Sequence, residues 1–201
     1  EWSEEKNIRW KTALPGSGHS TPVVWGDQVF LLSAVAHGEK LKVPEQPPGA
    51  HNNLDAEKMT RFVVVALSRR TGNIIWEKVV RNAQPHQSAH ESGTWASASP
   101  VTDGERVYAF FGSNGLYCLS TSGKLLWEKD FGDMQVKHGH GEGASPALHG
   151  ETLVVNWDHE GDSFVVALDA KTGKEIWRHP RDEVPSWATP VITEVDGKPQ
   201  A

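Results

Sequence analysis

A repeated segment constrains the fold of this chain more than any other feature. Three stretches align with one another, "STPVVWGDQVFLLSA", "SASPVTDGERVYAFFG" and "GASPALHGETLVVNWD". Each has Ser or Thr before Pro, a short apolar stretch, a polar turn with Gly, and a second apolar stretch. A third apolar stretch, a Gly turn and a tryptophan follow each time. Trp76, Trp127 and Trp177 are 51 and 50 residues apart, so the unit repeats about every 50 residues.

Four short strands in each unit predict a β-propeller. A repeat of about 40 to 50 residues with four strands is typical of a propeller blade. Gly72, Gly123 and Gly173 stand between the third and fourth strands, where a tight reversal needs a positive φ. We therefore predict an all-β fold, a partial β-propeller of about three four-stranded antiparallel blades with flanking single strands, as part of a larger ring.

The boundaries of the predicted units follow from the same pattern. Residues 1–201 are expected to form one partial propeller, with an orphan outer strand at 7–12, a blade at 20–80 that carries an insertion at 35–60, blades at 96–131 and 143–179, and the start of the next blade at 187–201. Known propellers have four to eight blades. We expect either that the sequence is a fragment of a longer chain or that the arc closes by self-association through open strand edges.

The repeated tryptophans are predicted to be structural. A buried Trp removes about 150 to 250 Å² from water, and one in the same slot of each blade would stabilise the packing of one blade on the next. Trp10, Trp76, Trp127 and Trp177 share this slot in the alignment. We interpret them as packing residues rather than as ligand-stacking residues.

Composition excludes two classes of partner. The net charge is -6, with acidic and basic residues interspersed, so no basic surface for nucleic acid is expected. The longest apolar stretches have the length of a strand, and no membrane span is expected. Cys118 has no second cysteine to pair with and lies in "LYCLS", which predicts a small buried core residue.

The turn motif resembles a known repeat family. Ala66 to Trp76 and Ala167 to Trp177 both read Ala-Leu-x-x-x-Thr-Gly-x-x-x-Trp. This pattern resembles the pyrroloquinoline-quinone-type (PQQ-like) repeat, and the chain looks most similar to secreted bacterial propellers of unassigned activity and to the lipoprotein propeller of outer-membrane protein assembly. The resemblance implies a periplasmic or extracellular location.

The same family includes quinoprotein dehydrogenases, and these imply particular cofactors. They hold PQQ under a disulfide between adjacent cysteines, beside a catalytic carboxylate bound to calcium. The one cysteine of this chain cannot form such a disulfide. We therefore expect no cofactor, with PQQ and calcium only under the alternative that the missing blades supply a catalytic site.

The histidines are predicted to gather on one face. In a propeller the links from the fourth strand of one blade to the first strand of the next lie on the same face as the turns between the second and third strands. Nine of the ten histidines fall in or beside these connections, and His149 falls on the opposite face. Because the links lead to the innermost strands, they should converge on the channel mouth. The predicted ligand-binding residues are His19, His90, Trp95, His138, His140, Glu142, Asp158, His159 and Trp187.

These residue types leave the kind of site open. Imidazole and carboxylate suit zinc or another borderline metal, and indole with imidazole suits a flat or sugar-like ligand. The acidic loop 158–162 offers oxygen ligands for calcium. The alternative is an exposed polar rim in which His and Gly serve solubility and turning. The insertion is either a lid or partner-contact surface, or a surface loop that the fold tolerates without a function.

Two functions remain after these steps. No nucleophile with a neighbouring base and no paired carboxylates are visible in the sequence. We therefore predict a non-catalytic binding or scaffold propeller that engages an unidentified ligand or protein on its His- and Trp-rich face. The alternative is a fragment of a quinone-dependent (PQQ and calcium) alcohol or sugar dehydrogenase.

Overall fold

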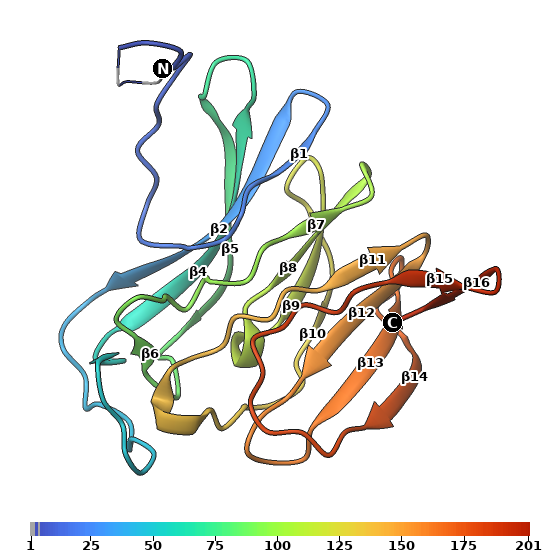
Figure 1. Cartoon of the computed structure of the whole chain (residues 1–201). Coiled ribbons are helices and arrows are strands. Elements are labelled where there is room, and N and C mark those ends of the chain that lie inside the picture. The colour runs from blue at the N-terminus through green and yellow to red at the C-terminus, as the bar shows by residue number, and fades with distance from the viewer. Residues whose placement is uncertain (1–2, 4) are drawn as a thin grey trace.

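The computed structural model describes residue 3 and residues 5–201, and these form three four-stranded antiparallel sheets arranged like blades (Figure 1). The first blade contains β1 (Val23–Trp25), β2 (Gln28–His37), β4 (Met59–Ser68) and β5 (Ile74–Ala83). The second contains β7 (Val101–Thr102), β8 (Arg106–Phe110), β9 (Leu116–Ser120) and β10 (Leu125–Lys129). The third contains β11 (Ala147–His149), β12 (Thr152–Trp157), β13 (Phe164–Asp169) and β14 (Glu175–Pro180). The predicted fold class, a partial all-β propeller, is confirmed.

Shorter elements complete the arc. A hairpin of β15 (Thr193–Val195) and β16 (Lys198–Gln200) stands where the start of the next blade is predicted. A two-stranded sheet joins β3 (Asn53–Leu54) to β6 (Ala89–His90), and two 3₁₀ turns are η1 (Gly112–Asn114) and η2 (Lys137–Gly139). Because β2 continues to His37 and β4 begins at Met59, the insertion is residues 38–58, shorter than the predicted 35–60.

The core lies between the blades because both faces of each sheet are apolar. Along β2, Phe30 and Leu32 pack with residues of β8 and β9 in the second blade. Val29 and Leu31 belong to a separate cluster on the other face of the first sheet, which includes Trp10. A strand that alternates between two buried faces reads as a nearly continuous apolar stretch. This is why the repeat is so hydrophobic.

Trp76 and Trp127 each join two successive blades. The indole N–H of Trp127 donates a hydrogen bond to the Ala170 carbonyl at 3.0 Å, in the turn of the third blade. Its ring covers Gly173, where an added Cβ would lie 2.7 Å from Trp127 Cε3. Trp76 relates in the same way to Thr121 and Gly123 of the second blade. The predicted structural role of these tryptophans follows directly, and so does the need for glycine under each ring.

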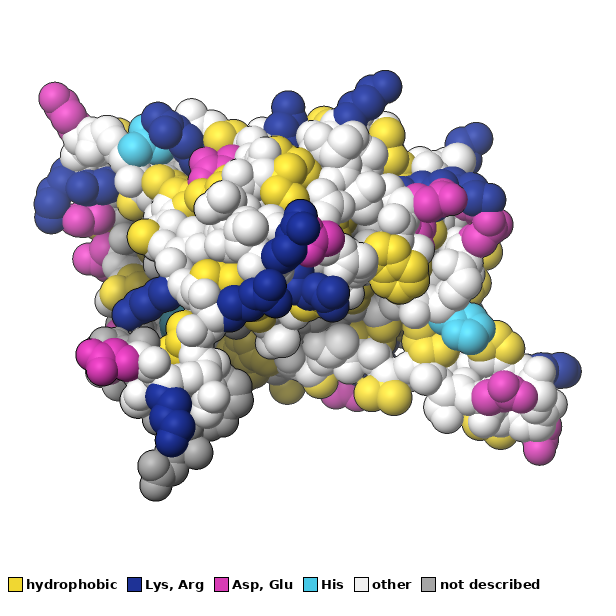
Figure 2. All heavy atoms as spheres, turned by 90° about the horizontal axis from the view of Figure 1, so that it is seen from above, with side chains coloured by type: hydrophobic (Ala, Val, Ile, Leu, Met, Phe, Trp, Pro, Cys, Tyr) yellow, Lys and Arg dark blue, Asp and Glu magenta, His cyan; other side chains and the backbone are white. Residues whose placement is uncertain are grey.

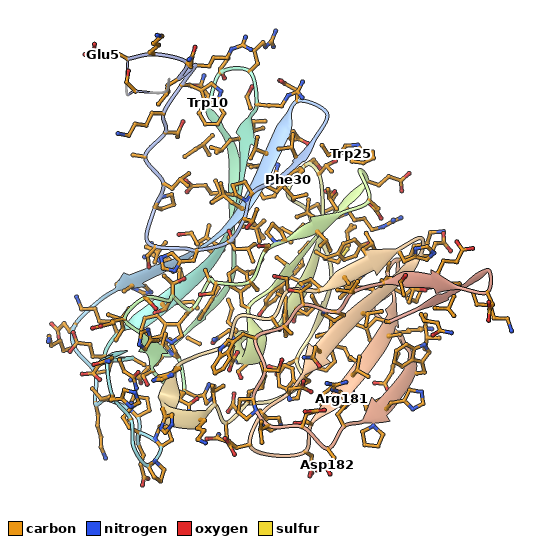
Figure 3. The ribbon with its side chains drawn as sticks, in the orientation of Figure 1. Glu5, Trp10, Trp25, Phe30, Arg181 and Asp182 are labelled. Carbon is orange, nitrogen blue, oxygen red and sulfur yellow. The ribbon has the colours of Figure 1, made fainter. Side chains whose placement is uncertain are left out.

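The first tryptophan fills its slot without a strand. Residues 7–12 form no strand, so the predicted orphan strand is wrong at the level of secondary structure. Trp10 nevertheless donates to the Arg69 carbonyl at 2.8 Å and covers Gly72. Figure 3 shows Trp10 beside the turn at the top of the first blade. Side-chain contacts of Trp10 and Thr12 with the turn of the first blade thus place this segment.

The Ser-Pro and Thr-Pro motifs connect the innermost strands. The backbone N–H of Thr21 donates to Ser99 Oγ, that of Ser99 to Ser145 Oγ, and that of Ser145 to Thr189 Oγ1, at 2.8, 2.9 and 3.1 Å. Each hydroxyl thus accepts from the equivalent residue of the preceding unit. The repeated hydroxyl before proline holds neighbouring blades together near the axis.

The turns and the links lie at opposite ends of the blades. Seen from the turn end, the surface carries scattered Lys, Arg, Asp and Glu, with His in isolated places (Figure 2). The links and the insertion lie at the other end, which we call the link face (Figure 1). Among the residues that the structure describes, no helix is long and apolar enough to cross a membrane.

Candidate functional site

Four histidines meet on the link face. His51 comes from the insertion, His90 from the link between the first and second blades, and His138 and His140 from the link between the second and third blades. The ring of His140 lies 4.9 Å from that of His51, 4.8 Å from that of His90 and 5.5 Å from that of His138, centroid to centroid. The rings of His51 and His138 are 5.1 Å apart. We call these residues the four-histidine cluster.

Glycines and hydrogen bonds position the cluster. Gly139 and Gly141 have positive φ, and His138 itself has φ of 59°, so the link turns sharply at each imidazole. His51 Nδ1 is 2.7 Å from the Gly49 carbonyl, and His90 Nδ1 is 2.7 Å from Ser92 Oγ. His138 Nδ1 and His140 Nε2 are buried without a hydrogen-bond partner. Two imidazole nitrogens therefore lack a partner where four rings meet.

Burial and like groups act on the central ring. Burial lowers the pKa of His140, and the neighbouring His90, His51 and His138 lower this pKa further. Among the described residues, no group of three or more His, Cys, Asp or Glu side chains is arranged to hold a metal ion. The lowered pKa thus favours the neutral form of His140.

A hollow of about 300 Å³ opens beside the cluster. Its lining residues are His90, Ser92, Gly93, Ser97, His140, Glu142, Gly143 and Trp187. Trp187 is 49% exposed, and its indole N–H donates to the Gly141 carbonyl at 2.9 Å. The absence of a side chain at Gly143 leaves room for this ring, because a Cβ there would lie 3.3 Å from Trp187 Cδ1. The hollow therefore combines a fixed aromatic wall with imidazole and hydroxyl groups.

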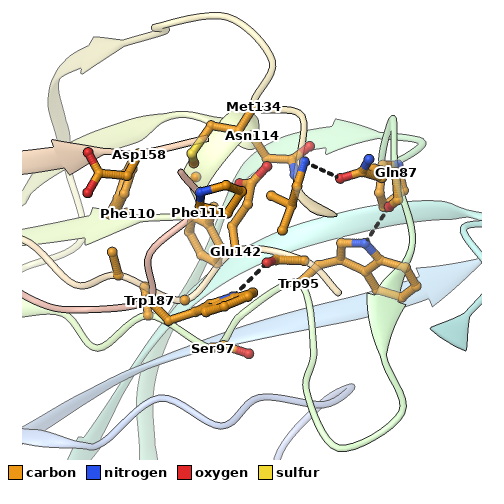
Figure 4. Close-up of a pocket in the computed structure, with 18 of the residues that line it drawn as sticks. Gln87, Trp95, Ser97, Phe110, Phe111, Asn114, Met134, Glu142, Asp158 and Trp187 are labelled. Carbon is orange, nitrogen blue, oxygen red and sulfur yellow. Dashed lines mark hydrogen bonds between the residues drawn. The ribbon is translucent and has the colours of Figure 1, made fainter. Parts of the chain in front are cut away.

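A narrow cavity of about 30 Å³ lies deeper, between Trp187, Glu142 and the second blade (Figure 4). Although Glu142 is partly exposed as a residue, its carboxylate points inward, where it accepts hydrogen bonds from the N–H of buried Ser113, at 2.6 Å, and from the Ser113 hydroxyl. Burial raises the pKa of Glu142, and the bonds from Ser113 partly offset this rise. The carboxylate is a polar group held where it is poorly solvated.

The acidic loop is not arranged as a calcium site. Asp158 is buried, and its carboxylate pairs with the Arg181 guanidinium through bonds of 2.8 and 3.2 Å. Asn156 Nδ2 donates to the same carboxylate at 3.0 Å. His159 lies on the neighbouring surface, where its Nδ1 accepts from the Gln135 N–H. These contacts use the Asp158 oxygens that calcium would need, and the described residues hold no group of three or more such ligands arranged for a metal ion.

The other predicted residues separate into two places. Trp95 lines the narrow cavity together with Trp187, and its indole N–H donates to the Gln87 carbonyl at 3.0 Å (Figure 4). His19 is exposed, and its backbone N–H donates to the Ala96 carbonyl, so this imidazole is not part of the cluster. The structure brings together His90, His138, His140, Glu142 and Trp187.

Two residues of the site were missed by the sequence prediction. His51 was placed on the correct face but was not included in the site, and Ser113 was not singled out. The signal for His51 is weak because it stands in an insertion without a repeat partner. Ser113 lies in "FGSNG", where two glycines indicate only a turn.

The narrow cavity does not fit PQQ and calcium. The narrow cavity has room for about one or two water molecules. The carboxylates at its wall already bind Ser113 and Arg181, and the single cysteine, Cys118, is buried in the second blade. No catalytic step through a quinone follows from these residues.

Comparisons with known proteins agree with this architecture. A family model described as outer membrane protein assembly factor BamB matches residues 58–132 and 117–195. The fold is similar to that of a europium-containing methanol dehydrogenase (TM-score 0.54, 15% identity, 87% of this chain and 26% of that one). It is also similar to that of the quinohemoprotein alcohol dehydrogenase ADHIIG of Pseudomonas putida HK5 (TM-score 0.50, 20% identity, 85% and 22%). BamB from Moraxella catarrhalis matches with a TM-score of 0.46 at 16% identity, over 91% of this chain and 57% of that one.

The coverage and identity of these matches limit what can be inferred from them. The chain spans about a quarter of the length of the two dehydrogenases, and the identities are low, so these structures show the fold alone. A search of curated protein sequences gave no match.

Proposed function

Because the chain belongs to the family described as outer membrane protein assembly factor BamB, we propose that it is a non-catalytic binding propeller that takes a small polar ligand, such as a sugar, on its link face. The observation that carries this proposal is the hollow beside the four-histidine cluster. Its volume of about 300 Å³ lies at the lower end of the range of about 300 to 1,000 Å³ that small-molecule sites occupy. The family and the fold class further support a periplasmic or extracellular location.

The chemistry of the hollow suits a ligand with an apolar face and several hydroxyl groups. The half-exposed indole of Trp187 is held in place by its bond to Gly141, so little side-chain entropy is lost when a ligand packs on it. Polar groups of His90, Ser92 and Ser97 stand at the rim of the same hollow. Aromatic walls with a few fixed polar groups are typical of small-molecule sites.

The test is a titration of the full chain with a panel of neutral mono- and disaccharides, followed by calorimetry and saturation-transfer NMR. We expect Trp187→Ala to lose binding and Trp25→Ala to retain it. Trp25 is a matched control because it is 54% exposed and covers Gly104 at the turn end (Figure 3). A sugar that binds equally well to wild type and Trp187→Ala, or no sugar binding at all, would contradict the proposal.

A second assay addresses the non-catalytic part of the proposal. The protein is mixed with PQQ and calcium, and dye reduction is followed with alcohols and sugars as substrates. We expect no turnover above the background without protein. Turnover that depends on the protein would replace the binding function by a dehydrogenase.

A further inference from the structure

The insertion is held on the link face mainly by polar contacts. All of residues 38–58 are described, and among them only Ala56 is buried. The larger apolar side chains Leu41 and Leu54 are 39% and 41% exposed. A segment with few buried apolar contacts opens at a small cost in free energy. The polar groups that hold it therefore decide whether it stays closed.

The hydrogen bonds that hold the insertion to the rest of the protein reach the link between the first and second blades and the link between the second and third blades. The strand β3 pairs with β6 through Asn53 opposite His90, and the Glu91 N–H donates to the Asn52 carbonyl at 2.7 Å. The Asn53 amide donates to the His138 carbonyl at 2.8 Å and to Ser88 Oγ at 3.0 Å. Opening the insertion therefore requires these hydrogen bonds between the insertion and the links to break together.

The four-histidine cluster lies at this junction. His51 is the contribution of the insertion, and its ring contacts those of His138 and His140 across the junction. The turn at Gly49 also lies against His138, because a Cβ on Gly49 would be 3.1 Å from His138 Nδ1. Opening the insertion thus moves His51 away and exposes the two imidazole nitrogens that have no partner.

Among the described residues, no carboxylate forms an ion pair with the four-histidine cluster, although Glu45 and Glu160 line a groove together with His138. The titratable side chains that act most strongly on His140 are His90, His51 and His138. Glu142 lies in the adjoining hollow, but its carboxylate is bonded to Ser113. The chain neighbours Glu91 and Lys137 are exposed. Protonation of more than one ring therefore places like charges about 5 Å apart with no bonded counter-ion.

We propose that the four-histidine cluster is a pH-operated latch, in which neutral imidazoles keep residues 38–58 on the link face and protonation releases them. Release widens a groove of about 560 Å³ between the insertion and the link that joins the second and third blades. The groove is lined by Glu45, Gln46, Pro47, Pro48, Gln135, Val136, Lys137, His138 and Glu160. The latch needs no ligand, so it stands or falls independently of the proposed sugar site.

The direction of the pH effect follows from His140. Its pKa in the closed form is below the ordinary value of 6.5, so the open form binds more protons. The contribution to closure is therefore complete above pH 6.5 and is lost as the pH falls through the lowered pKa. For each extra proton bound on opening, the opening equilibrium changes by up to about tenfold per pH unit.

Hydrogen exchange measured by mass spectrometry tests the latch on the full chain. Protection factors, corrected for the intrinsic effect of pH, are compared at pH 7.5 and pH 5.5 for peptides from the insertion and from β4. We expect insertion protection to fall by about tenfold or more at pH 5.5, while β4 keeps its protection. Equal insertion protection at both pH values would overturn the proposal.

Two variants show whether the cluster causes the effect. In His140→Gln we expect similar insertion protection at both pH values, because the ring with the lowered pKa is removed. In His51→Gln we expect a weaker pH dependence than in wild type, because the ring that joins the insertion to His138 and His140 is removed. His149→Gln, an exposed residue at the turn end, should keep the pH dependence of wild type. If His140→Gln releases the insertion at both pH values, the pH dependence of insertion protection in His51→Gln is the deciding measurement. A wild-type pH dependence in His51→Gln and in any His140→Gln that stays closed would overturn the latch.

Discussion

Replacing Gly173 by alanine tests how the blades are joined. Gly173 has φ of 69° and lies under the ring of Trp127, where an added Cβ would be 2.7 Å from Cε3 and 2.8 Å from Cδ2. Ordinary van der Waals contact begins at about 3.4 Å, so the ring must move. Gly150→Ala is the matched control, because Gly150 has φ of 55° in the same blade but nothing within 4 Å of an added Cβ.

The two substitutions share one cost and differ in another. A left-handed backbone costs a non-glycine residue about 1 to 2 kcal/mol, and both variants bear this cost. Gly173→Ala adds overpacking of about 1 to 3 kcal/mol against Trp127. We therefore expect a loss in the free energy of unfolding of about 2 to 5 kcal/mol for Gly173→Ala, and about 1 to 2 kcal/mol for Gly150→Ala.

Urea unfolding followed by circular dichroism measures both values. The double variant Gly173→Ala with Trp127→Ala isolates the clash, because removal of the indole also removes its contact with the new methyl group. We expect the double variant to be more stable than the sum of the single losses predicts. Equal losses for Gly173→Ala and Gly150→Ala, or additive losses in the double variant, would refute the blade-joining role of the Trp-Gly contact.

Further predictions concern the tryptophan slots and the link face. Trp127→Ala should cost about 3 to 5 kcal/mol of unfolding free energy, but Trp177→Ala, on the open edge strand β14, only about 1 kcal/mol, as urea unfolding would measure. Arg181→Ala should cost about 3 to 5 kcal/mol because it leaves the buried Asp158 carboxylate unpaired, whereas Asp158→Asn should cost less because Arg181 is 37% exposed. Glu142→Gln should raise Tm at pH 8, with the gain vanishing as the pH falls toward 4.5, because the raised pKa of Glu142 makes its charged form unfavourable in the folded protein.

The fold could be predicted because its signals are local and repeated. The Gly turns, the tryptophans and the Ser-Pro motifs recur in every unit. The tryptophans of the first two blades contact the Gly turn of the next blade, and the Ser or Thr hydroxyls before proline bond to the equivalent residue of the neighbouring unit. Where repetition stops, prediction fails. Residues 7–12 share only the tryptophan with the repeat, and they pack without joining a sheet. The insertion has no repeat partner, and its limits were set three residues too wide on the side of β2.

The site could be predicted only in part, since its contacts join segments far apart in the chain. His138 and His140 stand out because glycine surrounds them. Their meeting with His51 depends on a two-residue pairing of β3 with β6, which no sequence pattern indicates. Likewise, Asp158 resembled a calcium ligand until the structure placed Arg181, 23 residues later, against its carboxylate. Partners of this kind are set by the packing of links, which vary from blade to blade.

The link between the second and third blades is not optimised for stability at any single pH. The stabilising contribution of His140 is present above pH 6.5 and is lost in acid, because its pKa is lowered. That of Glu142, whose pKa is raised by burial, is present below pH 4.5 and is lost as the pH rises. These residues are two positions apart, so no pH gives both contributions in full. Groups with perturbed pKa values gather at functional sites more often than in scaffolds. The contrast with the Trp-Gly contacts, which do not titrate, therefore supports a functional role for this link.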